Sequence, residues 1–281
     1  ILGGLSIEAD FITLDSAMTV SELETLCGLT KSRFLLTDRL LALPHVEILN
    51  YDDFNDIAVS EHAFNFEYSN IAPDDIAYRV FDRETELIHC VTHQAAVTNI
   101  YGFASQFGFD KSTRLLSLNH HQGKAALVDV FATLSVGGTL VLPESQLSWT
   151  DINWGALVEK NRINTLHASS QQLSHLINRV EMGGLSSVSL VLAGGETSKS
   201  LLSKLKQHNK RIEFVSLNGI DAGLAYTAYS LCHENREVHD AYLPFGRALP
   251  GLSYKVLNEQ GSECPDYVVG QLWATSGKKN D

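Results

Sequence analysis

Short apolar runs alternate along the chain with segments in which apolar residues recur at helical spacing. Residues 33–37 and 75–81 are rich in apolar residues and predict strands, whereas residues 92–107 have the spacing of a helix. The alternation continues through predicted strands at 46–49, 114–118, 139–143, 165–168, 189–193 and 213–217, and predicted helices at 20–27, 124–134, 154–161, 171–180 and 199–208. This alternation is typical of an α/β fold with parallel strands.

Local signals mark several predicted boundaries. Thr19 with Glu22 three residues later has the spacing of a capping box at a helix N-terminus. Gly137-Gly138 predicts the end of the preceding helix, because glycine adopts the left-handed C-cap conformation without strain. After about Tyr242 the pattern changes to short strands separated by turns, which predicts a small β region.

Composition and charge narrow the class of protein. A chain of 281 residues with 44% hydrophobic and 19% charged residues can bury a large core and is typical of a folded domain. The net charge of −12 disfavours nucleic acid as a partner, because a phosphate backbone needs a basic face. No apolar run reaches the roughly 20 residues that span a bilayer, so no membrane partner is expected.

The four cysteines are far apart in the sequence and form no CxxC pair; they are Cys27, Cys90, Cys232 and Cys264. This spacing is typical of unpaired thiols in a reducing compartment, so we expect a cytoplasmic protein without a disulfide framework or a zinc site.

Several segments, in the same order, resemble the adenylation domains of nonribosomal peptide synthetases, which belong to the AMP-binding superfamily of adenylate-forming enzymes. Residues 132–143 (ATLSVGGTLVLP) are similar to the family's ALLAGATLVLP segment, and residues 189–196 (SLVLAGGE) are similar to RLVLVGGE. Further similar segments lie at residues 2–15, 33–38, 75–81, 243–261 and 268–273. The resemblance implies the large-subdomain fold of adenylate-forming enzymes, with layered α/β sheets and a small β region near the C-terminus.

The resemblance also implies a division of the chain. Residues 1–70 would be the remainder of a first α/β subdomain, residues 71–242 a central α/β subdomain, and residues 243–281 a β-rich segment of the large subdomain. The first part of that subdomain is expected to precede Ile1. The small C-terminal subdomain, which carries the family's catalytic lysine, is expected to follow Asp281.

At the position of the family's Gly/Ser/Thr-rich phosphate loop, this chain has Asp82-Arg83-Glu84-Thr85-Glu86. The family's loop cradles a triphosphate with backbone N–H groups and a lysine. Here no glycine is present, the segment is shorter, and its carboxylates would repel phosphate. We therefore interpret residues 82–90 as a solvated acidic turn and as a degenerate phosphate loop.

Two further positions of the family's chemistry differ in this chain. Lys124 stands where the resemblance places the aspartate that pairs with the substrate ammonium, and its simplest interpretation is a solvated lysine at a helix start. Asn218-Gly219-Ile220-Asp221-Ala222 stands at the family's YGPTE motif, so Ala222 replaces the metal-binding glutamate. Asp221 could take the metal from the neighbouring position, but a turn or helix-capping aspartate is the preferred interpretation.

Gly194-Gly195-Glu196 follows a buried predicted strand and keeps the family's tight strand-to-helix turn. In active relatives this segment lines the adenine pocket, so it is a candidate vestigial adenine pocket.

Other candidate residues have simpler structural interpretations. His89 and His93 have the spacing of two ligands on a helix face, but without an HExxH glutamate we interpret them as surface residues. His120-His121 are interpreted as surface or pocket histidines, and Ser169-Ser170 as a turn, because no nucleophile elbow surrounds them. The tryptophans Trp149, Trp154 and Trp273 are interpreted as packing residues.

Three positions of the family's chemistry are altered, whereas the segments that build the family's fold are preserved. This combination predicts a catalytically inactive pseudo-adenylation domain that is a structural or docking platform in a nonribosomal peptide synthetase. The resemblance implies neighbouring condensation or carrier domains as partners, with an MbtH-like protein as a further candidate, and no cofactor. The alternative is an atypical ligase that activates a non-amino-acid carboxylate with ATP and magnesium, because Lys124 could pair with an anionic substrate. A small-molecule binding or regulatory module that uses the old pocket is a third possibility.

Overall fold

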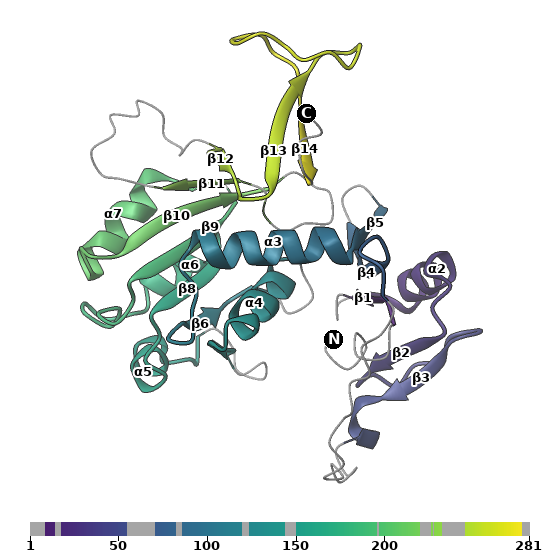
Figure 1. Ribbon diagram of the computed structural model, residues 1–281. Coiled ribbons are helices and arrows are strands. Elements are labelled where there is room, and N and C mark those ends of the chain that lie inside the picture. Colours follow the sequence, from purple (N-terminus) through teal and green to yellow (C-terminus); the bar gives the residue numbers. More distant parts are fainter. Residues whose placement is uncertain are drawn as a thin grey trace.

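The largest unit of the protein is a seven-stranded sheet (Figure 1). The computed structural model describes residues 9–14, 18–54, 71–82, 86–119, 124–143, 150–195, 197–219, 226, 228–231 and 245–276. The strand order is β12-β11-β10-β9-β8-β6-β7. Its parallel strands are β6 (Arg114–Ser117), β7 (Thr139–Val141), β8 (Thr165–Ser169), β9 (Leu190–Gly194) and β10 (Glu213–Asn218). The antiparallel strands β11 (Ala228–Leu231) and β12 (Arg247–Ala248) complete it.

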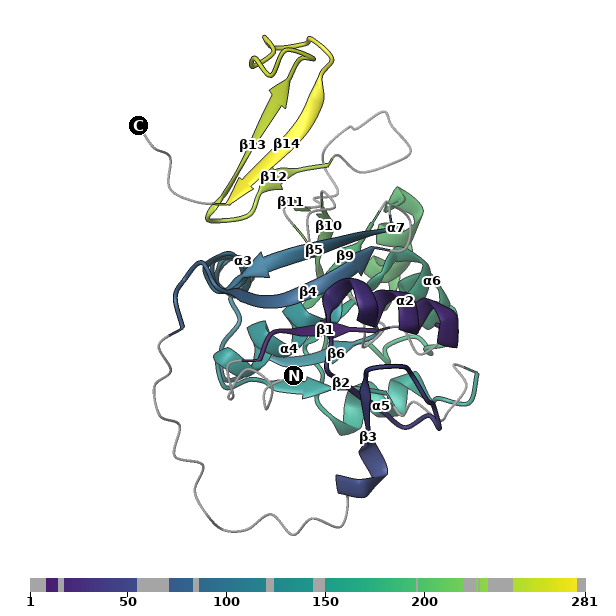
Figure 2. The same ribbon diagram turned by 90° about the vertical axis from the view of Figure 1, so that its right-hand side faces the viewer.

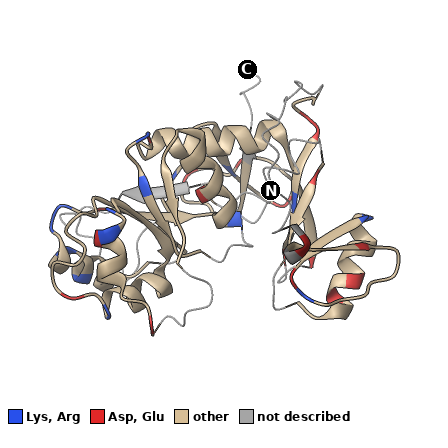
Figure 3. Ribbon diagram, turned by 90° about the horizontal axis from the view of Figure 1, so that it is seen from below, with Lys and Arg blue, Asp and Glu red and all other residues tan. Residues whose placement is uncertain are grey.

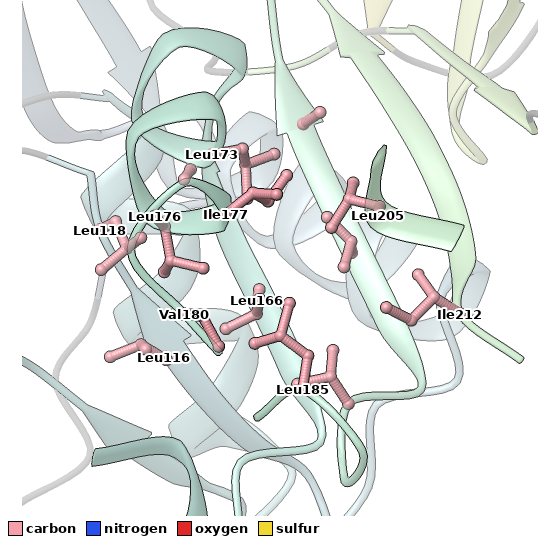
Figure 4. Packing of buried hydrophobic residues seen from close by; sticks show 14 of the residues in the cluster. Leu116, Leu118, Leu166, Leu173, Leu176, Ile177, Val180, Leu185, Leu205 and Ile212 are labelled. Atoms are coloured by element: carbon pink, nitrogen blue, oxygen red, sulfur yellow. The ribbon is translucent and has the colours of Figure 1, made fainter. Parts of the chain in front are cut away.

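Helices cover both faces of this sheet. Successive side chains of a strand point to opposite faces, and here both faces carry apolar residues that helices bury. On one face, Leu166 and Ala168 of β8 pack with α5 (Trp154–Lys160), α6 (Ser170–Ile177) and α7 (Lys199–His208) (Figure 4). On the other face, Leu115 and Leu192 pack with α3 (His93–Gln106) and α4 (Lys124–Ser135). The α/β architecture predicted from the sequence is confirmed, and the sheet is the framework that positions the site described below.

Three smaller sheets flank the large one. β4 (Ile76–Asp82) pairs in parallel with β1 (Phe11–Thr13) and antiparallel with β5 (Leu87–Thr92). The parallel pair β2 (Phe34–Thr37) and β3 (Glu47–Asn50) lies near α2 (Val20–Thr30), and η1 (Tyr51–Phe54) follows β3. β13 (Leu252–Leu257) and β14 (Gln271–Ser276) form an antiparallel hairpin that projects from the rest of the fold (Figure 2). The predicted β region near the C-terminus is therefore present.

Several local predictions are confirmed, and two are wrong. Gly137 has a φ of 75°, and the N–H of Gly138 donates to the Thr133 carbonyl, which closes α4 as predicted. Residues 87–90, interpreted as the end of an acidic turn, belong to strand β5 (Leu87–Thr92). Trp154 is buried as predicted, but the Trp273 side chain on the projecting hairpin is 52% exposed, so a packing role for it is wrong. Trp149 lies outside the described residues.

The capping box at the start of α2 is present. The backbone N–H of Thr19 donates to Glu22 Oε2 (2.7 Å), and the backbone N–H of Glu22 donates to Thr19 Oγ1 (3.3 Å). We expect Thr19→Ala to lower the free energy of unfolding by about 1 kcal/mol, because a helix N-terminal N–H loses its partner. Urea titration followed by circular dichroism measures this change. A stability equal to that of the parent would show that solvent replaces the cap without cost.

Charged residues of the helices lie mostly on the outside of the fold. Glu22 and Glu24 lie on α2, whereas α7 carries lysines, namely Lys199, Lys204 and Lys206 (Figure 3). None of the helices that the structure describes is both long and apolar enough to cross a membrane. Against this distribution, a fully buried aspartate on α4 is an exception, and it belongs to the candidate site.

Candidate functional site

The chain order places a natural ligand site at the ends of β6 and β8. β7 lies on one side of β6, whereas β8, β9 and β10 lie on the other side. The chain therefore changes direction at β6, and open α/β sheets bind ligands beyond the carboxyl ends of the strands at such a point. Ser117 ends β6 and Gly194 ends β9, with His167 of β8 between them in the sheet.

At this place the structure contains a buried hydrogen-bond network centred on Asp129 of α4. The Asp129 carboxylate is 0% exposed and contacts three donors from the carboxyl ends of β6 and from β8. The Ser117 hydroxyl and the Asn119 amide (2.9 Å) donate to Oδ2, and Nδ1 of the fully buried His167 contacts Oδ1. A buried carboxylate is tolerated only when it is paired and hydrogen-bonded, and these three contacts meet that requirement.

Tyr226 completes the network on the opposite side of the His167 ring. Its Oη lies 3.0 Å from His167 Nε2, and its backbone carbonyl accepts a hydrogen bond from Asn99 Nδ2 of α3 (2.9 Å). A methyl group on Gly194 would lie 2.5 Å from Tyr226 Oη, so only glycine allows this approach. The Phe103 ring lies near both rings, with centroids 6.0 Å from His167 and 6.3 Å from Tyr226. Tyr226 thus fills the space beside the end of β9.

The carboxylate fixes one proton of the network. A carboxylate only accepts hydrogen bonds, so His167 donates to Asp129 through Nδ1–H, and the direction of the hydrogen bond between Nε2 and the Tyr226 hydroxyl depends on the protonation of the imidazole. Burial, together with the negative charge of Asp129, raises the pKa of the Tyr226 phenol far above its ordinary value. The phenol therefore stays protonated and remains a donor. The arrangement resembles a nucleophile–histidine–aspartate relay in connectivity, but its hydroxyl is buried and held away from solvent.

A second polar cluster lies on the opposite face of the sheet, beside the ends of β9 and β10. The Ser170 and Thr197 hydroxyls are 2.8 Å apart, and Ser216 Oγ donates to Thr197 Oγ1 over 3.4 Å. Thr197 Oγ1 also donates to the Gly195 carbonyl (3.1 Å). These hydroxyls are satisfied by one another and by the backbone, so the cluster stabilises the turn between β9 and α7. Among the described residues, this cluster contains no charged side chain and no nucleophile–base pair.

The segment at the phosphate-loop position is a tight antiparallel hairpin. Asp82 is the last residue of β4 and pairs in register with Leu87 of β5, so only four residues connect the two strands. Asp82 is 9% exposed, and Glu86 has a φ of 56° and is exposed. The prediction of one solvated turn was therefore wrong at both ends, because Asp82 is buried and residues 87–90 are in β5. Arg83, Glu84 and Thr85 lie outside the described residues.

The other predicted positions are only partly within the described structure. Lys124 is the first residue of α4 and is half-buried, so the predicted helix start is confirmed. Asn218 ends β10 and donates through Nδ2 to the Phe245 carbonyl (2.9 Å), and the exposed Gly219 follows it. Ile220, Asp221 and Ala222 lie outside the described residues, so the structure does not describe the metal position.

The predicted glycine turn is present after β9. Gly194 ends the strand, and Gly195 has a φ of 81°, a left-handed conformation that glycine adopts without strain. The N–H of Gly195 donates to the Leu217 carbonyl of β10 (3.0 Å). Glu196 lies outside the described residues. The first two of the three predicted adenine-pocket residues thus adjoin the Tyr226 network.

The remaining histidine and cysteine candidates do not converge. His89 lies on β5 and His93 begins α3, so the two do not share a helix face. Among the described residues, no three His, Cys, Asp or Glu side chains lie together as potential metal ligands. His120, His121 and Cys232 lie outside the described residues. The free thiols of Cys27, Cys90 and Cys264 are separate from the network.

The sequence interpretation missed the residues that the fold brings together. Asp129, His167 and Tyr226 are separated by long stretches of sequence, and Tyr226 follows the end of β10. One available signal was Asp129 itself, a charged residue among the apolar residues 127–131 of a predicted helix. A charge at an apolar position indicates a buried partner, but it does not identify that partner.

A family model described as AMP-binding enzyme matches residues 90–278 of the chain. The chain belongs to the AMP-binding enzyme family. One similar curated protein is phenyloxazoline synthase MbtB of Mycobacterium sp. (strain MCS). It is 28% identical over 211 residues, which cover 73% of this chain and 18% of MbtB. The anguibactin system regulator of Vibrio anguillarum is 23% identical over 212 residues, which cover 73% of this chain and 20% of that protein. The chain thus spans only a small part of these relatives.

Solved structures of similar fold include parts of nonribosomal peptide synthetases. A variant of the nonribosomal peptide synthetase FmoA3 has a TM-score of 0.85 at 18% identity, over 98% of this chain and 30% of FmoA3. The N-terminal subdomain of Klebsiella oxytoca NpsA has a TM-score of 0.81 at 16% identity, over 98% of this chain and 70% of that subdomain. The AMP-binding family and the nonribosomal peptide synthetase adenylation fold predicted from the sequence are both confirmed.

Proposed function

We propose that this member of the AMP-binding family is a catalytically inactive adenylation-type domain that is a structural or docking platform in a multidomain synthetase. The observation that carries the proposal is the β4–β5 hairpin, in which Asp82 pairs with Leu87 across a four-residue connection. So short a connection without glycine leaves little backbone to surround a triphosphate with N–H groups.

Electrostatics at this hairpin supports the same proposal. The connection contains Glu84 and Glu86, and Asp82 precedes it. A phosphate charge about 4 Å from one carboxylate is disfavoured by about 4 kcal/mol at an effective dielectric constant of about 20. Several carboxylates at one place therefore oppose nucleotide binding, and the proposal requires neither ATP nor magnesium as a cofactor.

The expected result is that the protein does not bind ATP–magnesium and does not catalyse carboxylate-dependent pyrophosphate exchange. Isothermal calorimetry measures the first property, and exchange of labelled pyrophosphate into ATP measures the second. An active adenylation protein in the same buffer is the control. Micromolar ATP–magnesium binding by this protein would contradict the absence of a phosphate site, and exchange with any carboxylate would contradict inactivity.

The alternative is an atypical ligase that activates a non-amino-acid carboxylate with ATP and magnesium. Lys124 favours it, because a half-buried cation at the start of α4 could pair with a substrate anion. Solved neighbours of this fold include an AMPPNP-bound form of FmoA3 and NpsA in complex with 3-hydroxybenzoyl-AMSN. The exchange assay distinguishes this alternative from the platform, because only a ligase produces exchange.

The partners proposed for the platform are neighbouring condensation or carrier domains of the same synthetase. Two observations support neighbours of this kind. The curated relatives include pyochelin synthetase PchE, and the matched region covers 13% of its length. A solved neighbour is an artificially fused adenylation–PCP di-domain. An MbtH-like protein remains a further candidate, and a role in secondary-metabolite biosynthesis follows if the parent is such a synthetase.

A further inference from the structure

Helix α7, on the outside of the seven-stranded sheet, carries basic residues and no acidic residue (Figure 1). From the start of α7 to the turn before β10 the basic residues are Lys199, Lys204, Lys206, Lys210 and Arg211. The chain as a whole has 33 acidic and 21 basic residues, so this segment has the opposite charge to the rest. No ion pair among the described residues involves any of these five side chains. The outside of α7 is therefore a concentration of positive charge without a carboxylate partner in the described part of the fold.

The solvent side of α7 has uncharged side chains along its middle. Its opposite side is buried in the core by three leucines, namely Leu201, Leu202 and Leu205. A helix has about 3.6 residues per turn, so the residues farthest from these leucines are Ser200, Ser203 and Gln207. All three are exposed, and the Ser203 hydroxyl donates to the Lys199 carbonyl of the same helix (3.2 Å). Short side chains of this kind let a second helix approach α7 closely.

Lysines flank this uncharged stripe on both sides. Lys199 and Lys206 are two turns apart and lie along one edge, whereas the exposed Lys204 lies along the other edge. Lys206 Nζ donates to the Lys210 carbonyl (3.2 Å) beyond the end of the helix. A stripe of uncharged side chains between two rows of cations is the complement of a helix with carboxylates along both edges of its contact face.

The size of this basic face favours a helix over a larger polyanion. α7 has 10 residues, which corresponds to a length of about 15 Å. Charges on a protein surface are screened beyond about 8 Å at physiological ionic strength. A membrane or a nucleic acid would extend past α7 and meet the rest of a chain whose net charge is −12. A single helix contacts the basic face alone.

We propose that the outer face of α7 is a docking surface for an acidic helix of a neighbouring domain. This helix carries aspartate or glutamate along both edges of its contact face, and these carboxylates pair with the lysines that flank Ser200, Ser203 and Gln207. The inference rests on the docking role proposed above, to which it assigns a surface and a partner chemistry. It does not depend on whether the protein binds ATP.

The test uses the full chain and a fluorescent, alanine-rich peptide of about 20 residues, long enough to form a helix, with glutamates along two edges of one face. Lys199→Glu with Lys204→Glu replaces attraction by repulsion on both edges of the stripe. We expect this double variant to bind the peptide about tenfold more weakly than the parent at low salt. Glutamate is favourable in the first turn of a helix, so Lys199→Glu should preserve α7. Fluorescence anisotropy measures the binding, and circular dichroism checks the fold.

The matched control changes the net charge by the same amount at other places. Lys111 and Lys160 are exposed and lie outside α7, so Lys111→Glu with Lys160→Glu should bind the peptide as the parent does. Equal weakening by the two double variants would assign the attraction to overall charge and overturn the proposal. A peptide with glutamine in place of glutamate should bind the parent at least about tenfold more weakly. Equal binding of the two peptides would also overturn the proposal.

Further measurements separate the alternatives. If the charge-reversed variant does not fold, Lys204→Gln with Arg211→Gln should still weaken peptide binding about threefold, and unchanged binding would reject the α7 face. Vesicles of anionic phospholipid or duplex DNA that bind the parent in preference to the peptide would overturn the choice of a helix as partner. ATP–magnesium binding would contradict the inactive platform but leave the peptide result unchanged, whereas failure of the peptide to bind would overturn only the docking surface on α7.

Discussion

Replacing His167 with leucine is expected to lower the free energy of unfolding by about 3–5 kcal/mol, the largest effect predicted for any single substitution considered. Leucine fills a similar volume but donates no hydrogen bond to Asp129. The Asp129 carboxylate, which is fully buried, then keeps only the Ser117 and Asn119 donors, and the Tyr226 hydroxyl loses its hydrogen-bond partner. Guanidinium unfolding followed by tryptophan fluorescence measures the loss.

Two variants are the controls for this prediction. His175 is an exposed histidine on α6, and His175→Leu should change stability by no more than about 0.5 kcal/mol. The double variant His167→Leu with Asp129→Leu removes the unpaired charge, so it should lose less than the sum of its single variants. Additive losses would show that the two side chains are not coupled, in contradiction to the contact in the structure.

Most elements of the fold could be predicted because their signals are local. The apolar spacing of 199–208 coincides with α7, and the capping box at Thr19 begins α2 as expected. The fold of the whole chain was predicted from segments that follow one another in the order typical of the family. One of these segments, residues 132–143, contains the end of α4 and strand β7. Such patterns repeat within a few residues, so they are readable without tertiary contacts.

The turn predicted at the phosphate-loop position shows where local patterns mislead. Residues 87–92 (LIHCVT) include the β-branched residues Ile88, Val91 and Thr92, which favour a strand, yet the preceding carboxylates favoured a continuous acidic turn. In the structure these residues pair with β4, and its Asp82 is buried. The pairing of two adjacent strands overrides the local preference of the charges, and sequence composition does not contain the pairing register.

The network could not be predicted, because its contacts are between residues that are distant in sequence. His167 lies on β8 and Tyr226 follows β10, and their contact depends on the order of the strands in the sheet. The sequence interpretation assigned no role to His167 or to Tyr226. Of the positions transferred by resemblance, Asp82, Gly194 and Asn218 lie at the ends of β4, β9 and β10, but the contacts of the Asp129 network were not anticipated.

Replacing Gly194 with alanine is expected to lower the free energy of unfolding by about 1–3 kcal/mol, because the new methyl group overpacks a buried site. This methyl group would lie 2.5 Å from Tyr226 Oη and 3.3 Å from the phenol ring carbon that bears it. Either the ring or β9 must shift, and a shift of the ring weakens the hydrogen bond to His167. Guanidinium unfolding measures the loss, and the His167 Nε2 resonance reports whether Tyr226 has moved.

Gly28 on α2 is the matched control for this substitution. No atom lies within 4 Å of a methyl group placed there, and the residue is exposed. Gly28→Ala should raise the free energy of unfolding by about 0.5–1 kcal/mol, because alanine loses less backbone freedom than glycine in a helix. Opposite signs for the two substitutions would assign the cost at Gly194 to Tyr226 rather than to the general effect of adding a methyl group. If both substitutions stabilise the protein, Tyr226 does not occupy the space beside β9.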